Sequence, residues 1–299
     1  MKNIFSFTGI IACLLPIFIF TSCSSIKNEE KKQISSKIIE YVKDKSSLLQ
    51  NVDFIKNSEL EIENKSENFD ADFRLSILGS IDEDESNKNF LLNQSNISRQ
   101  SDDTTVNIGF INRKLSEDKN WLYGVNIFYD QEFPENHQRA SIGFEIKSQP
   151  VEFNFNYYDA FSNTKAVGDT TEKAMDGYDA EVGLQVPYIP QAKLFFSTYE
   201  WDGDDFDIKD GKKANLRFKS SNKITFEIGI DDNSKYDDAV TTAKISYNFL
   251  AKNQDEPKAL ISEKMFEHSD QSKNIYNMVR RQNRIVKTIT GTVTVGRGT

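Results

Sequence analysis

Alternation of apolar and polar residues with a period of two constrains this chain more than any other feature. In the stretch 120–130, one row of alternate positions consists of large apolar side chains: Trp121, Tyr123, Val125, Ile127 and Tyr129. The other row includes glycine, asparagine and aspartate. A half-buried strand of a soluble sheet would instead carry a mostly charged second row. The stretch therefore fits a strand whose apolar face meets lipid, with aromatic residues at both membrane interfaces.

Twelve segments share this alternation, and we predict each of them to be a strand. They are 59–65, 72–80, 89–97, 104–114, 120–130, 139–147, 151–158, 178–186, 192–201, 214–218, 223–231 and 242–249. From the fifth segment onward, short and long connections alternate, which is typical of an up-and-down barrel. We predict an all-β fold, an antiparallel transmembrane barrel of 12 strands over residues 58–250, with both of its ends at the rim that has short turns.

The N-terminus carries the features of an export signal. An apolar run at 4–20 follows Lys2 and is too short for a spanning helix, so residues 1–23 are predicted to be a signal peptide. The stretch F-T-S-C-S-S at 20–25 resembles a bacterial lipobox, which would make Cys23 the lipidated first residue. Ordinary signal cleavage is the alternative. After either cleavage no disulfide can form.

Two segments flank the predicted barrel. Helical spacing at 26–50 predicts a short amphipathic helix within a periplasmic segment, residues 24–57. Residues 251–299 are predicted to be a linker that is threaded through the lumen or lodged in it. Within this linker, 259–267 has helical character, and T-I-T-G-T-V-T-V at 288–295 resembles the start of a β structure that the chain does not complete. A disordered end that docks loosely in the lumen is the alternative.

The phase of the alternation assigns side chains to the two faces of the predicted wall. The residues predicted to face lipid are Trp121, Tyr123, Val125, Ile127, Tyr129, Ile142, Phe144, Ile146, Phe153 and Phe155. The residues predicted to face the lumen are Asn126, Asp130, Glu145, Lys147 and Glu181. Charge inside an aqueous lumen is hydrated, so these carboxylates do not require an acid–base reaction to explain them.

The sequence shows no motif that indicates catalysis. It has no G-x-S-x-G, no glycine-rich phosphate loop and no Cys/His metal spacing. His137 and His268 lack nearby ligand partners and are predicted to be ordinary surface groups. The acidic loop 202–211 lacks the glycine at the sixth position of a calcium loop, so we expect a solvated loop, with weak divalent binding as the alternative. We expect no enzyme activity, no cofactor and no metal.

The net charge of the chain bears on its partners. It is −9 at pH 7, and no basic stripe is present, which argues against nucleic acid as a partner.

Several motifs, in their order along the chain, resemble the β-domain of inverse autotransporters, the intimin and invasin family. They are W-L-Y-G-V-N-I-F-Y-D-Q-E-F (121–133), N-H-Q-R-A-S-I-G-F-E (136–145), D-G-Y-D-A-E-V-G-L-Q-V-P-Y-I-P (176–190), Y-E-W-D-G-D (199–204) and Y-N-M-V-R-R-Q-N-R-I-V (276–286). The last is similar to the family's linker motif, with Tyr276, Val279, Arg281, Asn283 and Ile285 at the matching positions. The resemblance implies a 12-stranded outer-membrane barrel with a linker in its lumen, leading to an extracellular passenger of immunoglobulin-like domains.

The chain departs from that pattern after Val286. Only about a dozen residues follow it, whereas an immunoglobulin-like domain needs roughly 100. We therefore expect an outer-membrane barrel that anchors and exports its own C-terminal segment without a complete adhesive passenger. The alternatives are a small passive pore, the vestigial stub of a split adhesin gene, and a periplasmic β-sandwich lipoprotein tethered at Cys23.

The resemblance also implies partners. We expect outer-membrane lipid around the barrel, and periplasmic chaperones and the barrel-assembly machinery during its assembly. Phe249, at the end of the last predicted strand, is similar to the terminal signal that this machinery reads. We expect a monomer.

Overall fold

The computed structural model describes residues 52–65, 72–84, 86, 88–202, 208–234, 238–250, 260–266 and 270–291. Cys23, the predicted signal peptide, the predicted amphipathic helix and His268 lie outside these residues, as do residues 203–207 of the acidic loop 202–211. Among the described residues, no helix has the length and apolarity needed to cross a membrane.

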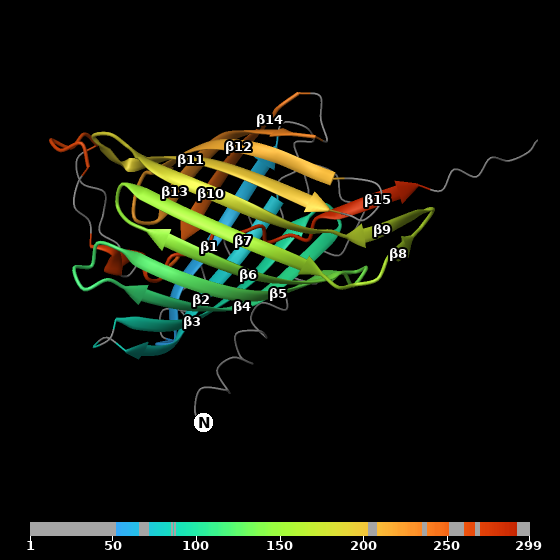
Figure 1. Ribbon diagram of the computed structural model, residues 1–299, viewed down its shortest axis with the longest axis horizontal. Coiled ribbons are helices and arrows are strands. Elements are labelled where there is room, and N and C mark those ends of the chain that lie inside the picture. Colours follow the sequence, from blue (N-terminus) through green and yellow to red (C-terminus); the bar gives the residue numbers. More distant parts are fainter. Residues whose placement is uncertain are drawn as a thin grey trace, which may run out of the picture. The chain divides into compact units, whose positions relative to one another are not determined.

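Twelve strands form one closed antiparallel barrel (Figure 1). In chain order they are β1 (Ile55–Lys65), β2 (Asp72–Asp84), β3 (Asn89–Gln100), β4 (Asp103–Leu115), β5 (Leu122–Phe133), β6 (Gln138–Lys147), β7 (Val151–Ala160), β10 (Asp176–Val186), β11 (Ile189–Asp202), β12 (Ile208–Lys219), β13 (Ile224–Asn233) and β14 (Val240–Asn248). Each pairs with its neighbours in this order, and β14 pairs with β1 to close the sheet. The predicted barrel is confirmed, and the β-sandwich alternative is wrong, because these strands form a single sheet closed on itself.

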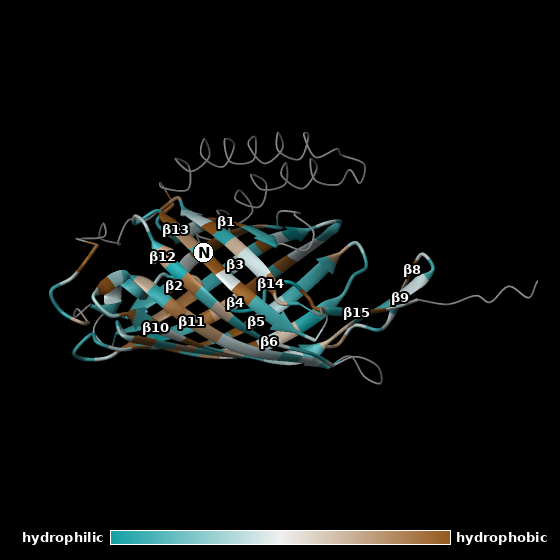
Figure 2. Ribbon diagram, turned by 90° about the horizontal axis from the view of Figure 1, so that it is seen from above, coloured by the Kyte–Doolittle hydropathy of each residue, from teal (hydrophilic) through white to brown (hydrophobic). Residues whose placement is uncertain are grey.

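The alternation of the sequence becomes the two faces of the wall. In β5, every residue of one row is buried from Leu122 to Glu132, while Tyr123, Val125, Ile127 and Tyr129 of the other row are exposed. Figure 2 shows hydrophobic and hydrophilic residues alternating along the strands in the same way. The outer surface of the wall is apolar because successive side chains of a strand point to opposite faces.

Several strands extend beyond the alternating segments. Strand β2 continues to Asp84 rather than ending at Ser80, and β12 begins at Ile208 rather than at Ala214. These extensions carry mostly polar residues, because backbone pairing continues past the apolar band that shaped the prediction. The predicted helical character at 259–267 is wrong for the described residues 260–266, which form bends.

The barrel has two rims. We call the rim at which β1 begins and β14 ends the N-terminal rim, and the opposite one the distal rim. In the second half of the barrel, the connections at the distal rim are longer than those at the N-terminal rim, as predicted. The predicted long connection 202–213 is reduced to five residues, because β12 begins at Ile208. In the first half, the distal connections 101–102 and 134–137 are also short.

A second, small sheet stands at the distal rim. The long connection between β7 and β10 contains a hairpin of β8 (Lys165–Val167) and β9 (Thr170–Ala174), and β15 (Lys287–Gly291) pairs antiparallel with β9. Figure 1 shows the three strands together at one end of the barrel. The β structure that the sequence predicted after Val286 is therefore continued by a hairpin of the barrel's own loop.

Candidate functional site

The C-terminal tail, residues 270–291, runs through the lumen from one rim to the other. At the N-terminal rim, the 3-10 helix η1 (Gln271–Asn274) is capped by the Asp270 side chain, and Gln271 N donates to the carbonyl of Lys119 in the turn between β4 and β5 (2.9 Å). At the distal rim, Met175 N donates to the carbonyl of Val286 (2.9 Å) before β15 begins. The tail thus begins and ends its passage at opposite ends of the barrel.

Side chains of the wall form hydrogen bonds with the backbone of the tail. Residues 275–286 belong to no helix or strand, so their amide groups need partners elsewhere. Wall donors to tail carbonyls are Asn57 to Tyr276 (2.8 Å), Arg113 to Asn277 (2.6 Å), Asn156 to Arg280 (3.0 Å), Arg139 to Gln282 (2.7 Å) and Asn107 to Asn283 (2.8 Å). In return, the amides of Val279 and Gln282 donate to Gln94 Oε1 (2.9 Å) and Tyr158 Oη (2.7 Å). The tail is extended and yet hydrogen-bonded along its course.

Tail arginines pair with carboxylates of the wall. Arg281 donates to both oxygens of Asp130, at 2.9 and 2.7 Å, and both side chains are fully buried. Arg139 binds the same carboxylate from β6, with Nε 2.9 Å from Oδ2. Arg280 is held by Glu181, and Arg284 by Asp72. The pairs are charge-assisted, and those at Asp130 and Glu181 are bidentate, the geometry that fixes orientation best.

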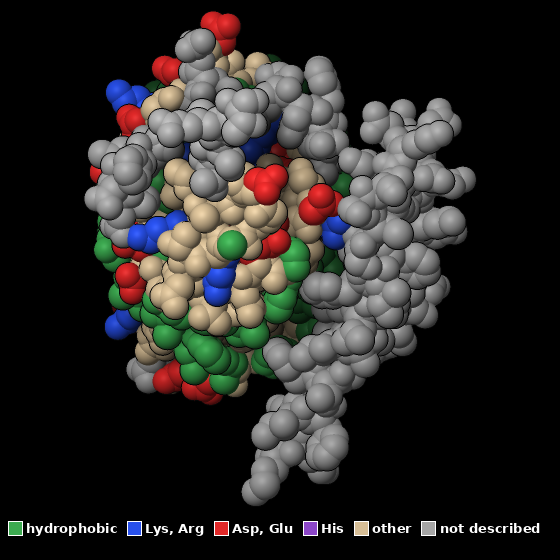
Figure 3. Space-filling model, turned by 90° about the vertical axis from the view of Figure 1, so that its right-hand side faces the viewer, with side chains coloured by type: hydrophobic (Ala, Val, Ile, Leu, Met, Phe, Trp, Pro, Cys, Tyr) green, Lys and Arg blue, Asp and Glu red, His purple; other side chains and the backbone are tan. Residues whose placement is uncertain are grey.

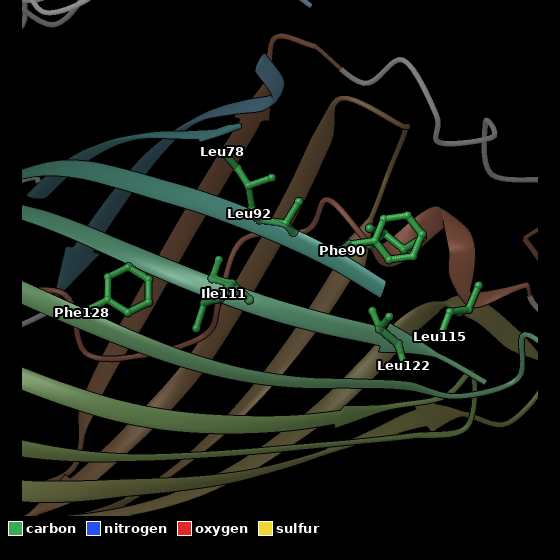
Figure 4. Packing of buried hydrophobic residues seen from close by; sticks show 9 residues of the cluster. Leu78, Phe90, Leu92, Ile111, Leu115, Leu122 and Phe128 are labelled. Atoms are coloured by element: carbon green, nitrogen blue, oxygen red, sulfur yellow. The ribbon is translucent and has the colours of Figure 1, made fainter. Parts of the chain in front are cut away.

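An apolar cluster holds the first part of the tail. It consists of Leu78, Phe90, Leu92, Ile111, Leu115, Leu122 and Phe128 on β2–β5, together with Ile275 and Val279 of the tail. Figure 4 shows the wall residues of this cluster pointing into the barrel toward the tail. These apolar side chains lie in the lumen row because the tail, rather than water, covers them.

The residues predicted to face the lumen lie inside the wall. Asn126, Asp130, Glu145 and Lys147 are buried, and Glu181 is half-buried. The expectation that their charges are hydrated is wrong for Glu145, which is 1% exposed and accepts from Arg113 Nε (2.5 Å) and Lys147 Nζ (2.6 Å). Its charge is balanced by buried cations because the tail displaces water from this side of the lumen.

The residues predicted to face lipid lie on the outer side. Exposed there are Trp121, Tyr123, Val125, Ile127, Tyr129, Ile142 and Phe144, while Ile146, Phe153 and Phe155 are half-buried. The partial burial of Phe153 has a local cause, since its ring packs 5.3 Å from that of Phe144, centroid to centroid.

The linker motif lies wholly inside the barrel. Tyr276 Oη donates to Glu83 Oε1 (2.9 Å), Asn283 Oδ1 accepts from Asn96 (3.0 Å), and Val279, Arg281 and Ile285 are buried. Sequence reasoning missed the wall residues that hold this motif, above all Arg113 and Arg139, which are both fully buried. The sequence contained a sign of this role, because both arginines fall in lumen rows, where a cation implies a partner of opposite charge.

Lys287 marks the point at which the tail leaves the lumen. Its Nζ lies 2.9 Å from Asp103 Oδ2, 2.9 Å from Glu132 Oε1 and 2.8 Å from Glu172 Oε2. Burial opposes the charge of Lys287, but the bonds to Glu172 and Glu132 outweigh it and raise the pKa of this ammonium. Figure 3 looks at this end of the molecule, where acidic and basic side chains are scattered over the surface.

His137 is not the surface group that was predicted. It is fully buried in the connection between β5 and β6, beside Ser162 and Glu172 of the loop that carries β8 and β9. Burial, followed by the nearby charge of Lys287, lowers the pKa of His137 below its ordinary value. The imidazole is therefore neutral at pH 7.

A cavity of about 830 Å³ remains beside the tail. The cavity is lined mainly by β1 and β11–β14, together with residues of the tail. Its charged side chains pair between strands: Arg217 of β12 with Glu227 of the neighbouring β13 (2.9 Å), and Lys193 of β11 with Glu152 of β7 across the intervening β10 (2.5 Å). The lumen is thus only partly filled by the tail.

The sequence matches the family model of the inverse autotransporter β-domain over residues 20–283. The chain belongs to this family. It is a protein of the bacterial outer membrane. Membership agrees with the closed 12-stranded barrel and with the linker motif in its lumen.

Relatives from Escherichia coli strain K12 cover parts of the chain. YchO, described as an uncharacterized protein, is 32% identical over 90 residues, which are 30% of this chain and 19% of YchO. A putative attaching and effacing protein homolog is 32% identical over 119 residues, 38% of this chain and 40% of the relative. The inverse autotransporter adhesin YeeJ is 25% identical over 133 residues, 42% of this chain and 6% of YeeJ. Each match spans less than half of the relative's length.

A solved chain has a similar fold. It comes from the structure "Unveiling the Mechanism Behind the in-meso Crystallization of Membrane Proteins" and has a TM-score of 0.62 at 19% identity. The likeness covers 78% of this chain and 100% of that chain. At 19% identity, the likeness shows a similar fold and nothing about function.

Proposed function

We propose that this barrel anchors in the outer membrane and carries its own C-terminal segment from the periplasmic side to the cell surface, in the manner of an inverse autotransporter. The observation that carries the proposal is the course of the tail, which is held at the N-terminal rim by Lys119 and at the distal rim by Met175. Adhesion is the described role of YeeJ, of which the match covers 6%, and it forms no part of the proposal.

The orientation follows from the topology. Both ends of the wall, β1 and β14, lie at the N-terminal rim, and short turns of outer-membrane barrels face the periplasm. The distal rim then faces the outside, together with β15 and the β8–β9 hairpin. The lumen binds the tail through backbone carbonyls as well as through side chains. The carbonyl contacts support a conduit, because they do not depend on the side-chain sequence of the tail.

The outer surface supports the anchoring part of the proposal. Exposed aromatic and aliphatic side chains cover the wall, and lipid is the partner that such a surface requires in a membrane. We propose a monomer, since a closed wall leaves no unpaired edge strand. Periplasmic chaperones and the assembly machinery are the proposed partners before insertion, with Phe249 as the terminal residue that is read.

Protease accessibility on intact cells tests the proposal. An epitope fused after Thr299 is expected to be digested on intact cells, because the tail leaves at the distal rim. The matched control is the same epitope inserted between Ser262 and Glu263, in the segment held by Tyr188 at the N-terminal rim. It is expected to resist until the outer membrane is permeabilised. Protection of the Thr299 epitope on intact cells would contradict export.

A passive pore is the second candidate, favoured by the cavity beside the tail. A variant that ends after Leu250 lacks the tail and should show a larger single-channel conductance in planar bilayers than the full chain, because the lumen is then unobstructed. Equal conductance of the two proteins would mean that the tail does not occupy the ion pathway. A full-length chain that conducts while its Thr299 epitope stays protected would favour the pore over export.

A further inference from the structure

The exit of the lumen contains more negative charge than the tail neutralises. Asp103, Glu132 and Glu172 come from β4, β5 and β9 and converge on the Lys287 ammonium within 2.9 Å. Glu135 groups with Asp103 and Glu132, their oxygens within 4.8 Å of one another. The Lys287 ammonium thus contacts three carboxylates, and a fourth lies beside two of them. Such an excess in a buried site favours binding of a cation of higher charge.

His137 adds an imidazole nitrogen to this group of carboxylates, and both kinds of side chain are common metal ligands. Its side chain is fully buried, and Nε2 has no hydrogen-bond partner among the described residues. Nε2 lies 3.5 Å from Glu172 Oε2, too far for a strong hydrogen bond. The other ring nitrogen, Nδ1, lies 3.3 Å from Ser162 Oγ. A second contact of this kind fixes the ring of a metal-binding histidine, so His137 is held with Nε2 aimed at the carboxylates.

The spacing of the donor atoms fits one ion. Glu132, His137 and Glu172 are all buried, and each offers an atom within 4.8 Å of the other two. Zinc binds imidazole nitrogen and carboxylate oxygen at about 2.0–2.2 Å and accepts three protein ligands with an open fourth position. Two carboxylates and a neutral imidazole are donors of this class.

We infer that this exit pocket is a cation site with two alternative occupants: the Lys287 ammonium while β15 is docked, and a divalent transition-metal ion such as Zn²⁺ when Lys287 is withdrawn. The two occupants exclude each other, because Glu132 Oε1 and Glu172 Oε2, the oxygens that contact Nζ, belong to the two carboxylates that would bind the metal. Zinc binding therefore competes with docking of the tail at the exit. The site goes beyond export and requires only the folded barrel.

Calorimetric titration of the folded full-length chain with Zn²⁺ alone tests this site. Lys287→Met removes the ammonium and keeps the packing of its stem, so K287M is expected to bind one Zn²⁺ at least tenfold more tightly than the parent chain. Adding His137→Ala to K287M is expected to reverse that gain. Lys209→Met is the matched control, since Lys209 Nζ donates to the Lys287 carbonyl (2.5 Å) and contacts the tail at the same exit. K209M should bind Zn²⁺ no more tightly than the parent chain.

Two results would overturn the inference. One is K287M that folds, as judged by its heat-dependent mobility on gels, and binds Zn²⁺ no more tightly than the parent chain. The other is a gain in K287M that survives His137→Ala, since the ion would then be bound elsewhere. In that second case, His268→Ala in K287M shows whether His268 is the other site, because loss of the gain would assign the ion there.

Discussion

At the residue scale, the lumen depends on buried ions that neutralise one another. Asp130 lies between Arg139 of the wall and Arg281 of the tail, and all three side chains are fully buried. Rings stack on the cations, with Arg281 4.3 Å from the centroid of Phe128 and Arg139 4.3 Å from that of Tyr158. Removing ions from water is costly unless their partners remain in place. The tail is therefore part of the electrostatic balance of the wall.

This balance predicts unequal effects for the two ends of one ion pair. Asp130→Asn keeps the shape but leaves Arg139 and Arg281 buried without a counter-charge, and should lower the free energy of unfolding by about 3–5 kcal/mol. Arg281→Met leaves Asp130 paired with Arg139, so its effect should be smaller. Urea titration of the folded protein in lipid vesicles measures both values.

The control for this comparison is Arg280→Met. Arg280 pairs with Glu181 but is 17% exposed, beside the cavity, where water can replace the lost contact. We expect R280M to have the smallest effect of the three variants. A larger loss in R281M than in D130N would contradict the arrangement described for Asp130.

At the scale of elements, glycines opposite aromatic rings shape the surface on which the tail lies. Gly109 of β4 pairs in register with Phe128 of β5, and a Cβ at Gly109 would lie 2.3 Å from that ring. Gly183 of β10 stands in the same relation to Phe195 of β11. The rings therefore lie over the neighbouring strand, where Phe128 meets Arg281 and Phe195 meets Arg280. Glycine at these positions allows an aromatic ring of the neighbouring strand to approach the backbone closely.

The strands were predictable, because alternation is a local signal repeated along each of them. The connections between the strands were harder to predict. Strand β15 is short and pairs with β9, which lies in a loop more than 100 residues earlier in the chain. The burial of His137 has the same origin, since the loop that covers it is distant in sequence. Such features depend on tertiary contacts that a single sequence does not display.

The site was predictable in part. The linker motif and the lumen rows follow from resemblance and from the phase of alternation. Leu122 and Phe128 in the lumen row had no explanation while the lumen was taken to be aqueous, and the tail supplies one. The pairing of a given arginine with a given carboxylate could not be predicted, because the path of residues 275–286 has no repeating geometry.

At the scale of the whole molecule, the wall and the tail form one structure with two ends. The apolar cluster and η1 hold the tail near the N-terminal rim, the arginines hold it at mid-lumen, and Lys287 with β15 holds it at the distal rim. The tail therefore crosses the whole lumen and docks on the β8–β9 hairpin.

Disulfide formation between β9 and β15 tests whether the tail docks in this way. Thr171 and Thr290 are partners in the β9–β15 register, with their hydroxyl oxygens 2.7 Å apart. Directly opposed residues of an antiparallel pair lie about 4.5–5.5 Å apart at Cα, which is within the range of a disulfide. The variant T171C/T290C, oxidised in intact outer membranes and mapped by mass spectrometry, should be cross-linked in most molecules. T171C/I289C should be cross-linked far less, because Ile289 points to the opposite face of β15. A folded barrel in which T171C/T290C remains reduced, or is cross-linked no more than T171C/I289C, would contradict the account.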